Sequence, residues 1–188
     1  MLKIIIFILI FINMAENNEA KNNVDKSIDY NDLDIYSDYI KGWEGKSLKA
    51  YKPVPTEENF TIGYGHYGSD VQEGDVWSDA RADSQLKTDI DDRIPAIKGS
   101  IKNFDSLPID LKKNIVGSWF RGSLSGSPKT IELINQGKYK EASEEFLNND
   151  EYQNAEKLGK SGIIPRMDAT ANSLLEYGQA LDNSDKNL

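Results

Sequence analysis

Glu44 and Thr61 are the residues whose types and surroundings best fit chemistry. Glu44 stands in the run Trp43-Glu44-Gly45, where a helical pattern ends, and Thr61 opens the run Thr61-Ile62-Gly63-Tyr64-Gly65-His66. A glycine that ends the helix, followed by a β-branched, glycine-rich run that folds back as a strand, would turn the Glu44 side chain into a cleft. A carboxyl group in a cleft can act as a general acid, and a threonine hydroxyl can hold a water molecule.

These two runs resemble the phage-type lysozymes, glycoside hydrolase family 24, and the resemblance extends over roughly Asp34 to Leu181. In that family a glutamate at the end of the first helix is the general acid, an aspartate follows nine residues later, and a threonine follows six residues after the aspartate. Glu44 corresponds to the acid and Thr61 to the threonine. The resemblance implies cleavage of the β-1,4 bond between N-acetylmuramic acid and N-acetylglucosamine in the glycan strands of peptidoglycan.

The aspartate of the family pattern is missing from this chain. Pro53 stands nine residues after Glu44, the interval to Thr61 is two residues longer than in the family, and no Asp lies between them. An inverting glycosidase needs a second group that activates water on the other face of the sugar. The longer loop offers Glu57 and Glu58, and we name Glu58 as the catalytic candidate. The alternative is that two adjacent glutamates simply form a solvated turn.

Three further residues are expected at the cleft. Tyr64 is predicted either to belong to the sheet core or to face a sugar. Arg121 falls near the point where the family has an Asn-containing turn that lines the cleft, although an arginine at the end of a buried helix can instead interact with the helix dipole or form a salt bridge. Arg166 lies in a run that resembles the family's C-terminal Gly-Leu-x-x-Arg-Arg, and we predict a structural or substrate-contacting role for it.

His66 is the only histidine in the chain, and there is no cysteine. A lone histidine after a glycine-rich strand more often pairs with a nearby carboxylate than acts as a catalyst, and Asp70 is the expected partner. We therefore assign His66 a structural role. Because zinc sites draw mainly on His and Cys ligands, a zinc site is not expected, and neither is a cofactor.

The composition is that of one acidic domain. The chain has 188 residues, with 22 basic and 31 acidic residues and a formal net charge of −9. This length is enough for a sizeable core in a single domain, which we expect to be monomeric. The acidic balance argues against nucleic-acid binding and against simple electrostatic capture by anionic wall polymers.

The N-terminal segment predicts export. Residues 1–15 combine Lys3 with the apolar block Ile4–Ile12, as in a signal peptide, and an uncleaved signal anchor is the alternative. Either would give transient contact with an inner membrane and delivery to the periplasm or beyond. Residues 16–33 are predicted to form a disordered polar tether, and residues 34–184 the lysozyme-like domain.

The remaining pattern predicts an α+β fold with a small sheet at one end of a larger helical lobe. A helix is expected to deliver Glu44, and a hairpin or small sheet to span 48–68. Helical patterns then follow, first from an N-cap at Ser78 through Ile94 to a stop at Pro95. The later ones are a central buried helix over 111–120, a helix that starts at Ser127-Pro128, a short helix over 139–147 and a last helix over 163–181.

Two other functions remain open at this point. The absent aspartate favours a lytic transglycosylase, in which the sugar's own 6-hydroxyl replaces water and one glutamate serves as acid and then as base. A catalytically silent module that binds wall glycans would keep the fold without the reaction, since a shared fold does not settle function.

Overall fold

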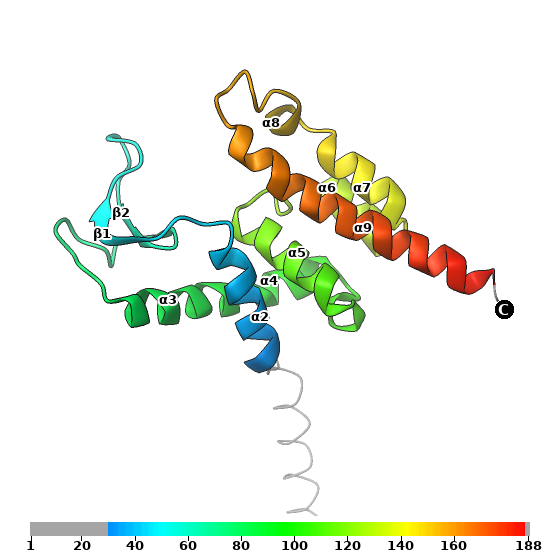
Figure 1. The fold of residues 1–188 in the computed structure, drawn as a ribbon, viewed down its shortest axis with the longest axis horizontal. Coiled ribbons are helices and arrows are strands. Elements are labelled where there is room, and N and C mark those ends of the chain that lie inside the picture. The colour runs from blue at the N-terminus through cyan, green and yellow to red at the C-terminus, as the bar shows by residue number, and fades with distance from the viewer. Residues whose placement is uncertain (1–29, 187–188) are drawn as a thin grey trace, which may run out of the picture. The chain divides into compact units, whose positions relative to one another are not determined.

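The structure, a computed structural model, describes residues 30–186, and the side chains from Asp32 onward (Figure 1). The predicted signal segment 1–15 and most of the predicted tether 16–33 lie outside the described residues. None of the helices in the described range is both long and apolar enough to cross a membrane.

The first described helix, α2 (Tyr30–Lys41), ends just before Glu44, as the sequence predicts. Its buried apolar side chains, Tyr36 and Ile40, lie four positions apart and therefore on one face. At the end of the helix the backbone amides of both Trp43 and Glu44 donate to the carbonyl oxygen of Ile40, at 2.9 Å each. This tight turn fixes the direction in which the Glu44 side chain leaves the helix.

A three-stranded antiparallel sheet follows, which confirms the predicted small sheet. Strands β1 (Ser47–Tyr51), β2 (Phe60–Gly63) and β3 (His66–Gly68) lie in the order β1-β2-β3. Pro53 and Pro55 fall in the connection between β1 and β2 rather than in a strand, because proline cannot donate to a ladder. The turn from β2 to β3 has glycines at positive φ, 67° at Gly63 and 96° at Gly65, a backbone conformation that other residues rarely adopt.

The helix after the sheet differs in length from the prediction. Ser78 caps α3 (Asp79–Asp91) by accepting a hydrogen bond from the Arg81 amide, but α3 ends at Asp91 and does not continue to Ile94. Ile94 instead begins α4 (Ile94–Ser100), and Pro95 lies in the first turn of that helix. A proline lacks the amide hydrogen that residues in a helix interior donate to the preceding turn, whereas the amides of the first turn have no acceptor within the helix. Pro95 therefore starts a helix where we expected it to stop one.

The rest of the chain is helical. It comprises the short 3₁₀ turn η1 (Phe104–Ser106), then α5 (Ile109–Phe120), α6 (Pro128–Asn135), α7 (Tyr139–Leu147), α8 (Asp150–Gln153), η2 (Ser161–Ile163) and α9 (Ile164–Asp185). Pro128 is the first residue of α6, as predicted. Ser127 stands at the N-cap position, but its hydroxyl accepts no hydrogen bond from the amides of α6 and instead donates to the Ser123 carbonyl oxygen.

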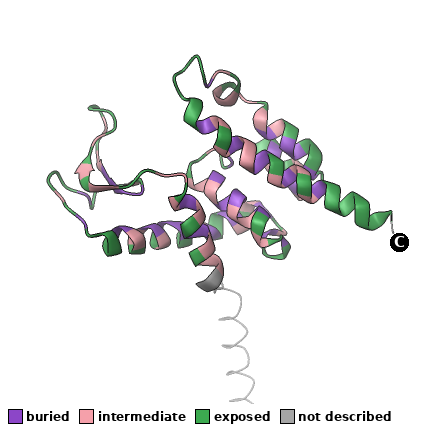
Figure 2. Cartoon of the chain, in the orientation of Figure 1, coloured by how far each residue is buried: buried purple, intermediate pink, exposed green. Residues whose placement is uncertain are grey.

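The helical core lies where α9 packs against α7 and α5 (Figures 1 and 2). Leu111, Ile115 and Val116 of α5 are buried, as predicted for the central helix over 111–120, whereas Trp119 and Phe120 are half-buried. From α9 the core receives Leu174 and Gly178, and the missing side chain of Gly178 lets the backbone of α7 approach closely. This packing holds the N-terminal turn of α9 in place.

Candidate active site

Glu44 is held by an arginine from the other end of the domain. Arg166 lies in the first turn of α9, and its Nη1 donates to Oε1 of Glu44 at 2.5 Å. Its Nη2 donates to the carbonyl oxygen of Trp43. The guanidinium therefore fixes both the carboxylate and the backbone that carries it, a fork geometry that lysine cannot reproduce.

The Glu44 carboxylate borders a pocket that opens to solvent. The side chain of Glu44 is 26% exposed and that of Arg166 is 22% exposed, so a molecule in the pocket could reach both. The second oxygen of Glu44, Oε2, makes no hydrogen bond within the described part of the chain. The pocket is lined by residues of α2, α5 and α9 and of the turns after α2 and α5, namely Tyr39, Ile40, Trp43, Glu44, Gly117, Ser118, Arg121, Ser123, Arg166, Met167 and Thr170.

Arg121 lies at the pocket and also forms a salt bridge. It lines the same pocket as Glu44, and its Nη2 forms an ion pair with Oε1 of Glu151 at 3.3 Å. Lys160 approaches the same Glu151 oxygen at 3.4 Å, so two cations share one carboxylate. The salt bridge is therefore present, and a contact between Arg121 and substrate stays a prediction.

Thr61 lies in the middle of the sheet between two exposed tyrosines. It pairs with Tyr51 of β1 on one side and with Tyr67 of β3 on the other. Directly paired residues of antiparallel strands point to the same face, so the three side chains form a row. Thr61 is buried, while Tyr51 and Tyr67 are 43% and 48% exposed. Thr61 is not among the residues that line the Glu44 pocket, and its catalytic role stays a prediction.

Tyr64 is a buried residue with a polar partner. Its hydroxyl donates to Oδ1 of Asp83 at 2.9 Å, and Lys41 forms an ion pair with Asp83 at 3.2 Å. Burial raises the pKa of the Tyr64 phenol, and the hydrogen bond from Tyr64 lowers the pKa of Asp83. Of the two roles predicted for Tyr64, these contacts favour the sheet core.

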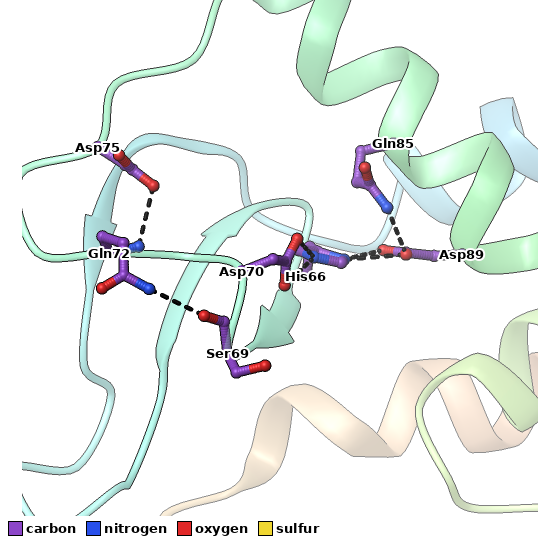
Figure 3. A network of polar contacts seen from close by, with 7 residues as sticks. All are labelled: His66, Ser69, Asp70, Gln72, Asp75, Gln85 and Asp89. Atoms are coloured by element: carbon purple, nitrogen blue, oxygen red, sulfur yellow. Dashed lines mark hydrogen bonds and ion pairs between the residues drawn. The ribbon is translucent and has the colours of Figure 1, made fainter.

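His66 lies between two carboxylates (Figure 3). Its Nε2 pairs with Oδ2 of Asp70 at 3.1 Å, as predicted, and its Nδ1 pairs with Oδ1 of Asp89 at 2.9 Å. The hydrogen bond with His66 holds the pKa of Asp70 below its ordinary value. Asp89 is buried in α3 and also accepts a hydrogen bond from Gln85 at 3.0 Å. The histidine thus ties β3 to α3, which agrees with a structural role.

Comparison with known proteins assigns the chain that carries this site to a protein family. The phage lysozyme family model matches residues 41–169, which include Glu44, Thr61 and Arg166. The chain belongs to the phage lysozyme family. The endolysin of Bacillus phage PZA is 37% identical to it over 113 residues, 57% of this chain and 42% of that protein. The endolysin of Lactococcus phage c2 is 50% identical over 64 residues, 34% of this chain and 27% of that protein.

The chain therefore aligns with less than half the length of these endolysins. A similar solved structure is the muramidase domain of SpmX from Asticaccaulis excentricus, with a TM-score of 0.55 and 20% identity. The match covers 75% of this chain and 95% of that domain. At this identity the comparison establishes the fold, which is the predicted lysozyme-like α+β fold.

The two glutamates in this chain's longer loop, between Glu44 and Thr61, differ in their exposure to solvent. Glu57 is half-buried and Glu58 is exposed. Glu58, the candidate named from sequence, has the environment of a solvated turn residue, and its catalytic role stays a prediction. Sequence reasoning did not find Asp89, although an aspartate between Leu86 and Ile90 on the buried face of a helical pattern was a signal for it. Nor did it pair Glu44 with Arg166.

Proposed function

We propose that this protein is a peptidoglycan hydrolase, a muramidase that cleaves the β-1,4 bond between N-acetylmuramic acid and N-acetylglucosamine and so lyses bacterial cell walls. Membership of the phage lysozyme family and similarity to phage endolysins support the proposal. The observation that carries it is the carboxyl group of Glu44, which borders an open pocket and is held through one oxygen by Arg166. An acid in this position has one oxygen fixed and the other available to a ligand.

In this reaction Glu44 would give its proton to the oxygen of the leaving N-acetylglucosamine through Oε2. Protonation makes that oxygen a better leaving group, and the sugar passes through an oxocarbenium-like transition state. Arg166 would keep the carboxyl group oriented throughout, because positioning itself lowers the barrier. The Thr61 hydroxyl would hold the attacking water, and the exposed rings of Tyr51 and Tyr67 offer apolar faces for sugars on either side of it.

A lytic transglycosylase is the second candidate, favoured by the absence of an aspartate between Glu44 and Thr61. In that reaction the 6-hydroxyl of N-acetylmuramic acid attacks its own anomeric carbon as the bond to the leaving oxygen breaks. Glu44 would protonate the leaving oxygen and then take up the hydroxyl proton. The product would have a 1,6-anhydro ring in place of a reducing end.

Export is part of the proposal, because peptidoglycan lies outside the inner membrane. The charged and apolar pattern of residues 1–15 supports delivery to the periplasm or the exterior, with transient membrane contact. We further propose that the enzyme acts as a monomer. Both points can be examined by fractionating cells that express the full chain and by sedimentation of the purified protein.

The test is digestion of purified peptidoglycan, followed by mass spectrometry of the released ends. Reducing N-acetylmuramic acid ends would establish hydrolysis, and anhydro ends would establish transglycosylation. Glu44→Gln should reduce either activity by at least about 10³-fold, because Glu44 is the only acid among the described residues that line the pocket. Glu141→Gln, at an exposed position of α7, is the matched control. A folded wild-type protein that releases nothing would instead favour a silent glycan-binding module.

A further inference from the structure

The connection between β1 and β2, residues 52–59, has a fixed shape. The Lys52 ammonium group donates to the Glu57 carbonyl oxygen at 2.7 Å, and the Glu57 amide donates to the Val54 carbonyl oxygen at 3.0 Å. At the end of the connection the Asn59 amide donates to the Tyr67 hydroxyl at 3.2 Å. The connection is thus held by a lysine of its own and by a tyrosine of β3. These contacts define where the Glu57 side chain begins.

The Glu57 carboxyl group has an unusual environment. Its Oε2 is buried and has no hydrogen-bond partner within the described part of the chain. Burying a carboxylate oxygen without a hydrogen-bond partner costs free energy. A loop side chain that was free to turn outward would avoid this cost, because its carboxylate would then be hydrated. Glu58, its neighbour, is exposed. The loop therefore holds one of its two glutamates inward with an acceptor position open, which is what a group that takes a proton from water requires.

The sheet connects this carboxyl group with the threonine expected to hold the water. Glu57 precedes Thr61 by four residues, and the strand β2 begins between them at Phe60. Tyr67, whose hydroxyl accepts the hydrogen bond from Asn59, is also the residue paired with Thr61. One side chain thus contacts the loop that carries Glu57 and flanks Thr61. The loop end and Thr61 lie at the same part of the sheet.

We propose that Glu57 is the carboxylate that activates the attacking water, in place of the aspartate that the chain lacks. This inference rests on the proposed hydrolysis. Glu57 takes a proton from the water, and the water oxygen forms a bond to the anomeric carbon of N-acetylmuramic acid. The bond from that carbon to the leaving oxygen breaks, and the leaving oxygen takes the proton of Glu44. One acid and one base act on opposite faces of the sugar, as in an inverting enzyme.

The test compares Glu57→Gln with Glu58→Gln, two identical substitutions at adjacent positions, in the full chain acting on purified peptidoglycan. Glu57→Gln should lower kcat by about 10²-fold to 10⁴-fold with little change in KM, because glutamine cannot accept the proton. Glu58 is the rival candidate for the base, and Glu58→Gln should lose far less activity than Glu57→Gln if the base is Glu57. Glu141→Gln, at an exposed position of α7, is the control outside the site and should stay within about twofold of the wild type. Sodium azide, an anion that attacks without needing a base, should restore bond cleavage in Glu57→Gln and yield a glycosyl azide.

Each other result overturns the inference. Glu57→Gln activity within about fivefold of the wild type would do so, and so would a large loss in Glu58→Gln alone. A large loss in Glu57→Gln that azide does not restore would show a structural role, as would a lowered melting temperature that explains the loss. Anhydro ends from the active wild type would remove the need for a water base and leave Glu44 as the acid. A wild type that cleaves nothing would overturn the proposed function itself, and this inference with it.

Discussion

Replacing Arg166 should both destabilise the domain and impair Glu44. Arg166 donates to the Glu44 carboxylate and to the Trp43 carbonyl oxygen, and both charged side chains are about three-quarters buried. Breaking an exposed ion pair costs about 0–1 kcal/mol, and removing one partner of a fully buried pair costs about 3–5 kcal/mol. For this intermediate burial we expect Arg166→Met to lower the free energy of unfolding by about 2 kcal/mol. In a chain of this size that corresponds to about 4–8 °C in Tm.

The assay is thermal unfolding followed by circular dichroism, with turnover of peptidoglycan measured on the same samples. Arg166→Lys can keep one of the two contacts but not the fork, so its loss of stability should be about half as large. Turnover in Arg166→Met should fall by about 10²-fold, since a misdirected acid loses its alignment with the leaving oxygen. Arg81→Met, which removes an exposed arginine that stacks on Trp77 at 4.5 Å, is the control and should cost about 0.5–1 kcal/mol.

A double-mutant cycle with Glu44→Gln isolates the pair itself. Because the two side chains contact each other directly, their coupling energy should be about 1–2 kcal/mol. Additive effects of the two substitutions would refute the reasoning, since they would show that Arg166 does not stabilise the Glu44 carboxylate. A melting temperature of Arg166→Met within about 1 °C of the wild type, together with unchanged turnover, would refute it as well.

Two further predictions concern stability. Gly178→Ala should destabilise the domain by about 1–2 kcal/mol despite the better helix propensity of alanine. The new Cβ would lie 2.9 Å from Cγ of Lys140 and 3.1 Å from the Lys140 backbone nitrogen. Chemical denaturation measures the change in the free energy of unfolding, and an increase in stability would contradict the prediction. Asp70→Asn should remove the stability that the hydrogen bond with His66 gives to the charged Asp70 carboxylate. In the wild type this stability is fully present above the ordinary carboxyl pKa of 3.8 and is lost as the pH falls through the lowered pKa of Asp70 in the folded protein. Unfolding curves of wild type and variant between about pH 2 and pH 6 should therefore converge at the acid end, and a difference that grows toward acid would contradict the assignment.

Local signals in the sequence were sufficient to predict the secondary-structure elements around Glu44. The helix end before it, the sheet after it and the serine cap at Ser78 each depend on residues close together in the chain, so propensity and turn chemistry predict them. Pro95 was misread because a proline is compatible with both the end of one helix and the first turn of the next. Sequence alone does not distinguish the two when a helix boundary lies one or two residues before it.

The partners of the site residues could not be predicted in the same way. The contact of Arg166 with Glu44 depends on how α9 packs against α5 and α7, and no local pattern encodes that packing. Asp89 was missed for a related reason, since a buried aspartate makes sense only once His66 is placed against it from the sheet. The difference between Glu57, which has a buried carboxylate oxygen, and Glu58, which is exposed, is likewise not encoded by two adjacent glutamates in a loop.

The separation between Glu44 and Arg166, 122 residues, has a consequence for the timing of synthesis. A ribosome adds about 5–20 residues per second, so the glutamate would emerge on the order of 10 s before the arginine that holds it. During that interval a nascent chain can form α2 and the sheet, whose contacts are mostly local, but not the oriented acid. The proposed wall-cleaving activity would therefore arise only when nearly the whole domain has been made, and a prematurely released fragment would carry Glu44 and Thr61 without a competent site.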